Sequence, residues 1–315
     1  MNRDQLINAL YESIGEACVT DPGIAHIEIH ANKVLGVHLV EGLEIEADEL
    51  KDGIRATLVV KKNTKIDQPV RICFGLMQKT GIQKIDMNIR LEENARVAIM
   101  ASCTFPNAEE IVHTMDADID IGKNAEYIYL ERHVHGTEGG INVVPKAKIH
   151  LHEGAKFRTD FELIKGRCGK IDIDYEADCE RNSYLDMVAR ISGRADDRIL
   201  INERATLRGD GAHGVLRTSI AVRDRAKAEI KNTLVATAPN ARGHVDCKEV
   251  VQGEAIANAI PIVEVHHPKA HVTHEASIGS VDSKQLETLM SRGLSEDEAT
   301  DLIIEGLLSP EGQPF

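Results

Sequence analysis

The sequence predicts a mainly β protein, a right-handed parallel β-helix with a flanking N-terminal helix and a C-terminal helical hairpin. Three observations lead to this fold class. Apolar and polar residues alternate through the middle of the chain, and a short phrase ending in a small residue recurs there. The 315 residues also include no Trp and only five Phe and five Tyr. A narrow interior between stacked turns suits Ile, Val, Leu and Ala better than large aromatic rings.

The first element is a helix over residues 3–18, where apolar residues fall on one stripe: Leu6, Ile7, Leu10, Ile14 and Ala17. This helix is expected to cap or flank the β-helix. We divide the chain into an N-terminal helix at 1–20, a β-helix core at 21–281 and a C-terminal helical segment at 282–315.

Repeats are clearest between residues 88 and 265. The phrase stands at 89–97, 119–127 and 149–157, with weaker copies centred on Cys179, Ala205, Ala226 and Ala255. Alternation with period two indicates strands that bury one face, and a Gly or Asn before a buried Ala indicates a tight bend. A β-sandwich is the alternative, but its strands recur about every 8 to 12 residues. It also favours Asn-Gly hairpin turns, which are missing here.

The C-terminal segment reads as two short helices. Apolar residues recur over 285–290, and a turn follows at Arg292 and Gly293. Ser295 with Glu298 then forms a capping box before a helix that stops ahead of Pro310. This hairpin carries more apolar surface than it can bury within itself. It closes the end of the β-helix, docks a partner protein, or does both.

Charge and cysteine content exclude several functions. The net charge of −14 argues against a nucleic-acid or membrane-surface partner. No apolar run approaches the roughly 18 residues of a membrane span. The six cysteines are scattered singly, as expected of free thiols in a reducing compartment. We therefore expect a cytoplasmic protein.

A candidate metal-binding constellation lies late in the chain. Cys247 is followed by four histidines within nine residues and then by Glu275; the histidines are His266, His267, His271 and His274. Thiolate, imidazole and carboxylate together bind soft or borderline transition metals or an iron–sulfur unit. The spacing is poor for a closed structural zinc site. The alternative is a solvated polar edge strand whose histidines are incidental.

Other chemical signatures are weak or absent. His133 and His135 are two apart, so they share one strand face, where a satisfied polar face and a ligand pair are equally plausible. Residues 166–171 lack the spacing and hydroxyl of a P-loop, and there is no GxSxG or dinucleotide-binding motif. A β-helix carbohydrate enzyme would need aromatic platforms, and the chain has no Trp. The sequence therefore favours a protein that is not an enzyme.

The C-terminal region resembles a known family. Residues 272–282 read VTHEASIGSVD, and residues 289–295 read LMSRGLS. Glu-Ala at 298–299 and Leu-Ile at 302–303 follow. This stretch is similar to the C-terminal signature of the SufB/SufD family. A looser similarity covers roughly residues 90–310. The resemblance implies a right-handed parallel β-helix and a place in the SUF system for iron–sulfur cluster assembly.

The resemblance further implies a role and partners. SufB-type chains are scaffolds for a transient iron–sulfur cluster, [4Fe-4S] or [2Fe-2S]. They act with SufC, an ABC-type ATPase that binds the C-terminal helices, here around Leu289, Leu302 and Ile303. They form homodimers, or heterodimers with another SufB/SufD chain, through their β-helices. A SufD-like structural or iron-delivery subunit is the alternative role.

Residue by residue, Cys247 matches the family's sulfur-accepting or cluster-ligating cysteine, and His274 with Glu275 matches a His-Glu ligand pair at the dimer interface. SufD-like chains usually carry Gly at the position of Glu275, which favours SufB. Two departures stand out, because Thr273 occupies a position that is often Glu and His133 replaces an internal cysteine. The chain is also shorter at its N-terminus than bacterial members, like the compact and often archaeal members of the family.

Overall fold

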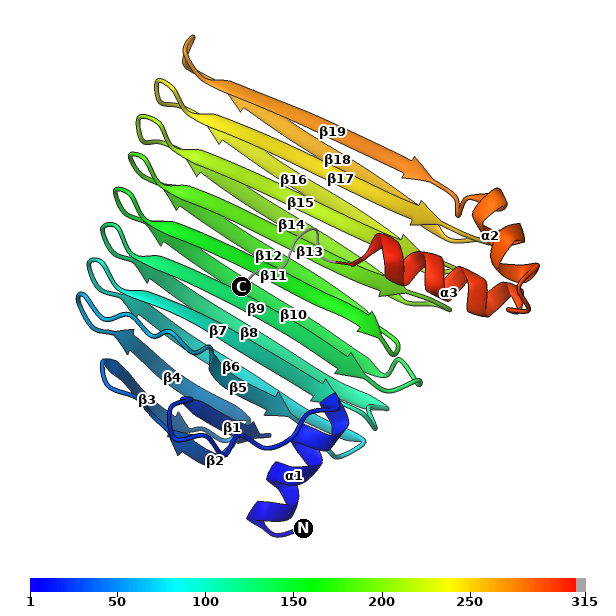
Figure 1. The fold of residues 1–315 in the computed structure, drawn as a ribbon, viewed down its shortest axis with the longest axis horizontal. Coiled ribbons are helices and arrows are strands. Elements are labelled where there is room, and N and C mark those ends of the chain that lie inside the picture. Colours follow the sequence, from blue (N-terminus) through cyan, green and yellow to red (C-terminus); the bar gives the residue numbers. More distant parts are fainter. Residues whose placement is uncertain (310–315) are drawn as a thin grey trace.

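The computed structural model describes residues 1–309, and it shows a parallel β-helix built from two facing sheets (Figure 1). The ten-stranded sheet contains β1 (His26–His30), β2 (Lys33–His38), β5 (Val70–Gly75), β7 (Arg96–Phe105), β9 (Glu126–His135), β11 (Lys156–Lys165), β13 (Tyr184–Gly193), β15 (His213–Val222), β17 (Arg242–Val251) and β19 (His271–Gly279). The nine-stranded sheet contains β3 (Leu43–Glu49), β4 (Gly53–Val60), β6 (Thr80–Leu91), β8 (Glu110–Ile121), β10 (Ile141–Leu151), β12 (Lys170–Cys179), β14 (Arg198–Leu207), β16 (Lys227–Ala236) and β18 (Ile256–Val265). The helices are α1 (Arg3–Ile14), α2 (Ser283–Met290) and α3 (Glu296–Leu307). The predicted fold class is confirmed.

Successive turns of the β-helix stack in register. From β5 onward the chain alternates between the two sheets, and each strand pairs in parallel with the strand one turn away. The N-terminal end differs, because β1 pairs with β2 and β3 pairs with β4 in antiparallel fashion. Two short antiparallel pairs thus begin a parallel stack, a feature that the repeat pattern did not predict.

The helix α1 is shorter than the sequence predicted. Asn2 and Gln5 form a capping box at its start, and Gly15 ends it in the left-handed conformation with φ of 74°. Ala17, expected on the apolar stripe, therefore lies beyond the helix. Leu10 and Tyr11 are buried and pack in one cluster with Cys73 of β5, so α1 covers part of the outer face of the ten-stranded sheet.

One corner of each turn repeats the same local structure. A residue with positive φ precedes a buried small residue; the positive-φ residues are Asn94, Asn124, Gly154, Asn182, Gly211 and Asn240. The small residue then donates its N–H to the carbonyl three residues earlier, as at Ala95, Ala125, Ala155, Ser183, Ala212 and Ala241. The predicted bend of Gly or Asn before a small residue is confirmed.

The predicted positions of the weaker repeats, at Cys179, Ala205, Ala226 and Ala255, do not mark one corner of the β-helix and were wrong as a single series. Cys179 and Ala205 lie inside β12 and β14, and Ala226 and Ala255 belong to the opposite corner, before β16 and β18. Alternating strands look alike in a sequence, so copies from two corners were merged into one series. Measured at a single corner, each turn spans 28 to 30 residues.

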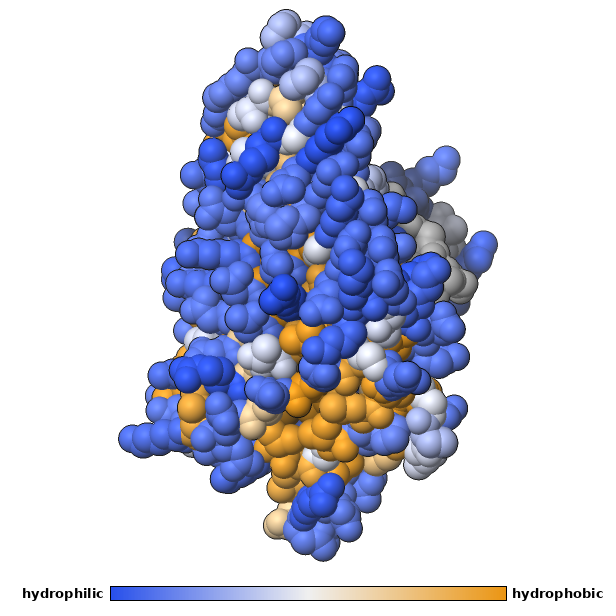
Figure 2. All heavy atoms as spheres, turned by 90° about the vertical axis from the view of Figure 1, so that its left-hand side faces the viewer, coloured by the Kyte–Doolittle hydropathy of each residue, from blue (hydrophilic) through white to orange (hydrophobic). Residues whose placement is uncertain are grey.

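Surface polarity follows this architecture. The face shown in Figure 2 is hydrophilic over most of its height, and apolar side chains gather over the N-terminal strands. Partly buried apolar residues of this end pack against the core, among them Val34, Leu39, Val40 and Ile45. Among residues 1–309, no helix is both long and apolar enough to cross a membrane.

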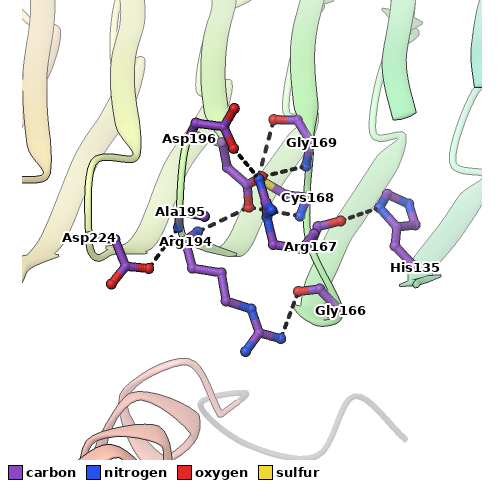
Figure 3. Close-up of polar contacts among 10 residues, drawn as sticks. His135, Gly166, Arg167, Cys168, Gly169, Arg194, Ala195, Asp196 and Asp224 are labelled. Atoms are coloured by element: carbon purple, nitrogen blue, oxygen red, sulfur yellow. Dashed lines mark hydrogen bonds and ion pairs between the residues drawn. The ribbon is translucent and has the colours of Figure 1, made fainter. Parts of the chain in front are cut away.

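A buried carboxylate organises one corner near the middle of the β-helix (Figure 3). Asp197 accepts hydrogen bonds from the backbone N–H groups of Cys168, Gly169 and Arg194 at 3.0 to 3.1 Å. It also accepts one from Arg167 Nε at 2.8 Å. These donors fix the turn between β11 and β12 against the next turn.

Asp197→Ala should lower the free energy of unfolding by about 3 kcal/mol, because three backbone donors and a guanidinium lose a buried partner. Urea denaturation at neutral pH measures this change. Asp196→Ala is the matched control, since Asp196 pairs with the same Arg167 but its side chain is 80% exposed. That variant should change stability by less than about 1 kcal/mol. Equal losses in the two variants would contradict the role of Asp197.

The interior also holds a carboxyl group without a charged partner. Glu203 points inward from β14 and is 2% exposed, and its Oε2 atom has no hydrogen-bond partner in the described structure. Burial raises its pKa from 4.5 to about 8. The folded protein therefore keeps a proton on Glu203 at a pH where the unfolded chain has lost it.

The stability that Glu203 contributes should fall as pH rises from about 5 to 8, because in that window the unfolded chain loses the proton that the folded chain keeps on Glu203. Glu203→Gln should remove the part of the pH dependence that one proton causes. This part changes the free energy of unfolding by at most about 1.4 kcal/mol per pH unit. Denaturation curves at several pH values measure the slope. Glu229→Gln on the exposed face of β16 is the control and should leave the slope unchanged. An unaltered slope in Glu203→Gln would refute the assignment.

Candidate functional site

Cys247 lies inside the β-helix near its C-terminal end. It belongs to β17, its side chain points into the interior, and it is fully buried. In register it stands beside Thr218 of β15 on one side and Ala276 of β19 on the other. Since β19 is the last strand of its sheet, Cys247 is one strand away from the open end of the stack.

The surroundings of Cys247 are polar. Asn232 Nδ2 of the facing strand β16 lies 3.8 Å from the Cys247 sulfur. Thr218 Oγ1, Asn232 Oδ1 and both carboxyl oxygens of Glu249 are buried without a hydrogen-bond partner in the described structure. Unsatisfied buried polar atoms are uncommon in folded proteins and need an explanation. The side chains around Cys247 thus carry more hydrogen-bonding atoms than they use with one another.

Burial keeps the Cys247 thiol protonated. Desolvation raises its pKa to about 11. The neighbouring Glu249 carboxyl has its pKa raised to about 7, chiefly by desolvation. A thiol in this state is a poor nucleophile and a poor metal ligand, because the thiolate performs both tasks. The closed interior therefore holds Cys247 in an inactive form.

His274 and Glu275 lie on opposite faces of β19. In register, His274 stands beside the inward-pointing Val245, whereas Glu275 stands beside Asp246 on the outer face. Both residues are exposed. The structure therefore places His274 on the same face as Cys247, beside Val245, which precedes Cys247 by two residues. It leaves Glu275 on the other side of the strand.

The remaining histidines of the predicted constellation lie near this end of the β-helix. His266 is exposed and pairs with Glu264 at 3.3 Å. His267 is half-buried in the turn before β19, and His271 is exposed at the first residue of β19. Within residues 1–309, Cys247, His274 and Glu275 do not form a group whose ligand atoms lie within 4.8 Å of one another. One chain alone does not assemble the three predicted ligands.

Two other groups in the described chain do meet that geometric condition. One is on the surface and consists of His150, His152 and Glu180. The other is buried and consists of Cys103, Glu131 and His133. The sequence pointed to His133 and His135 as same-face residues but did not connect them with Cys103. The signal was present, since Cys103 precedes His133 by one turn of 30 residues.

The helix α3 lies beside the ten-stranded sheet, and α2 stands beyond the end of β19 (Figure 1). Ile304 and Leu308 pack against Ala221 of β15, and Arg223 pairs with Asp301 at 2.7 Å. Of the residues predicted to bind a partner, Leu302 is 49% exposed, Leu289 is half-buried and Ile303 is buried. The predicted C-terminal segment also includes residues 310–315, which lie outside the described residues.

Comparison with known proteins supports the same family as the sequence. Residues 76–307 match the family model of the SUF system FeS cluster assembly SufBD core domain. An iron–sulfur cluster assembly SufBD family protein of Methanocaldococcus jannaschii is 39% identical over 90% of this chain and 89% of its own length. A protein of the same description from Pyrococcus horikoshii is 33% identical over 90% of this chain and 87% of its own.

The family match covers nearly the whole stack of turns that carries Cys247, as well as both C-terminal helices. The two archaeal relatives have almost the same extent as this chain, which agrees with the compact form that the sequence indicated. The chain belongs to the SufBD family of iron–sulfur cluster assembly proteins.

Proposed function

We propose that the chain is a SufB-type scaffold that assembles an iron–sulfur cluster at Cys247 and works with a SufC-type ATPase. The observation that carries this proposal is the position of Cys247, a buried thiol among polar side chains one strand from the open end. A purely structural chain has no need for a buried cysteine surrounded by unsatisfied oxygen atoms.

The open end supports pairing with a second SufBD chain. On β19, His274, Ala276 and Ile278 continue the interior face and are exposed, because the described stack has no further turn to cover them. Val272 continues the same face and is half-buried. Ile278 alone is 54% exposed. The edges of β18 and β19 are also unpaired in their sheets. A second chain placed against this end would cover apolar surface and bring further ligands to Cys247 and His274.

Cluster chemistry requires this end to open. The Cys247 thiol must lose its proton before it binds iron or attacks a donor persulfide. In that attack the Cys247 thiolate bonds to the outer sulfur, the donor's S–S bond breaks, and the donor leaves as a thiolate. Separation of β19 from β17 would admit water and lower the pKa of the thiol. An ATPase docked on α2 and α3, which follow β19 directly, is well placed to drive such a movement.

Cys247→Ser should abolish assembly of the cluster. The test reconstitutes the full chain with ferrous iron and sulfide without oxygen, with and without the ATPase, and records the visible charge-transfer absorption. The serine variant should retain less than about a tenth of the absorption, because its hydroxyl is a hard ligand that stays protonated. Cys179→Ser is the control, since Cys179 is equally buried but lies in β12, away from the open end.

The competing role is that of a SufD-like subunit. It is favoured by the placement of Glu275 on the outer face, away from Cys247. If the parent protein acquires no visible absorption while Cys247→Ser still supports full activity of the complex, the SufD-like role replaces the scaffold role.

Leu302→Asp should weaken binding of the ATPase at least tenfold without unfolding the chain. Leu302 and Leu307 are exposed on α3, and Met290 is exposed at the end of α2, so they offer an apolar surface to a partner. A buried interface leucine is worth a few kcal/mol, more than the 1.4 kcal/mol of a tenfold change. Calorimetric titration with the ATPase measures the affinity. Leu200→Asp, at an equally apolar exposed site on β14, is the control. Unchanged affinity in Leu302→Asp would exclude this surface.

A further inference from the structure

A cluster of metal-ligating side chains lies deep inside the β-helix, several turns from Cys247. Cys103 comes from β7, and Glu131, His133 and His135 come from β9. His113 joins them from β8 of the opposite sheet, with its ring centroid 6.0 Å from that of His133. Cys103 is fully buried, Glu131 is 2% exposed, and His113 and His133 are 1% exposed. The cluster is therefore shielded from solvent.

The register of the stack creates this cluster. Cys103 and His133 are direct partners on neighbouring parallel strands, one turn apart. Glu131, His133 and His135 alternate along β9, so all three side chains point inward. Cys103 Sγ lies 3.8 Å from Glu131 Oε1, and His133 Nε2 lies 2.8 Å from the same oxygen. Strand geometry thus holds three ligand types around one point.

The hydrogen bonds define the tautomers of two imidazoles. His135 Nδ1 lies 3.0 Å from the carbonyl oxygen of Arg167, which only accepts, so this nitrogen carries the proton (Figure 3). In a neutral ring His135 Nε2 is then an acceptor, and it receives the proton of His133 Nδ1 at 3.2 Å. His133 Nε2 is left with a lone pair directed at Glu131. Imidazoles that bind metals commonly donate their second N–H to an outer acceptor, and here the acceptor for His133 is His135, which the Arg167 carbonyl holds in turn.

Two features of the cluster bear on ligand binding. The lone pair of His133 Nε2 faces a carboxyl oxygen, so the contact holds only if Glu131 is protonated. Both ring nitrogens of the buried His113 have no hydrogen-bond partner in the described structure. A neutral, hydrogen-bonded core network would leave neither nitrogen unused. A metal cation could therefore replace the proton between Glu131 and His133, and the unpartnered imidazole of His113 lies nearby.

We propose that Cys103, Glu131 and His133 bind a divalent transition-metal ion of the zinc class inside the β-helix, with His113 as the fourth ligand. His135 and the Arg167 carbonyl serve as the outer support of His133. This site is separate from the candidate cluster site at Cys247, and it does not depend on the proposed scaffold function.

Charge balance favours this assignment. Binding of the ion displaces one proton from the Cys103 thiol and one from the Glu131 carboxyl, and both protons leave to solvent. One thiolate and one carboxylate then offset the two positive charges, so the buried site is neutral overall.

The dimensions suit a tetrahedral ion. Bonds of roughly 2.0 to 2.3 Å place the ligand atoms of a tetrahedral zinc site about 3.3 to 3.8 Å apart. The ligand atoms of Cys103, Glu131 and His133 already lie within 4.8 Å of one another, whereas His113 is outside this group and its ring would have to move closer to join them. One sulfur, one oxygen and two nitrogen donors match zinc, which such ligands also bind more tightly than ferrous iron.

The test uses cobalt(II) as a spectroscopic probe in the full chain carrying Cys247→Ser, so that no thiolate signal comes from the candidate cluster site. The protein is unfolded with chelator and refolded with cobalt(II), because the site is closed in the folded state. We expect about one ion per chain, a near-ultraviolet thiolate-to-cobalt band, and displacement of that band by zinc. Adding Cys103→Ser should remove the band, and His113→Phe should weaken binding at least tenfold while preserving the ring volume.

Two controls make the outcome decisive. Cys179→Ser removes a buried thiol elsewhere in the core, and a double change of His150 and His152 to Gln removes the surface group. Both should keep the band and the stoichiometry. Zinc should also raise the melting temperature of the parent protein but not of a folded Cys103→Ser or His113→Phe variant. Absence of the band, its persistence in Cys103→Ser, or its loss only in the His150 and His152 variant would overturn the proposal.

Discussion

Stacking in register is the constraint on which the rest of this structure depends. Each turn of 28 to 30 residues returns the chain to the same sheet position, so every inward side chain lies about 4.8 Å from its counterpart one turn away. Apolar residues in these stacked positions pack against one another and form a continuous core of mainly Ile, Val, Leu and Ala. An inward polar residue must instead find a polar neighbour on the next strand or across the interior. Polar groups inside the β-helix are consequently found in clusters.

Such clusters carry a cost in stability. Thr218, Asn232 and Glu249 around Cys247 all have buried oxygen atoms without partners, and each such atom costs about 1 to 3 kcal/mol. Glu203, in register with Asn232, adds a carboxyl that burial keeps protonated. A chain selected for stability alone would fill these positions with Val or Leu. Their presence at one end of the stack is a physical argument for chemistry there.

The architecture could be predicted from the sequence, because alternation and the Asn-Ala or Gly-Ala corners are local signals. The merged repeat series around Cys179 and Ala205 shows the limit, since the two sheets share one alternation pattern and only pairing separates them. The sequence could predict that Cys247 and His274 share a region. Which of His274 and Glu275 faces the same way as Cys247 depends on the register between β17 and β19, which a single sequence does not reveal. The buried cluster escaped notice because Cys103 and His133 are neighbours only after the chain completes a turn.

The depth of a thiol in the stack determines what it can do. Cys247 is separated from the open end by β19 alone, so loss of one strand pairing is enough to expose it, and a cargo bound there can be released by the same movement. Cys103 lies between β5 and β9 with many turns on its C-terminal side, so its release requires the interior to come apart. An ion held at Cys103 would therefore enter during folding and remain. With the two proposed sites, the same ligand chemistry would give a transfer site at one position of the stack and a resident site at the other.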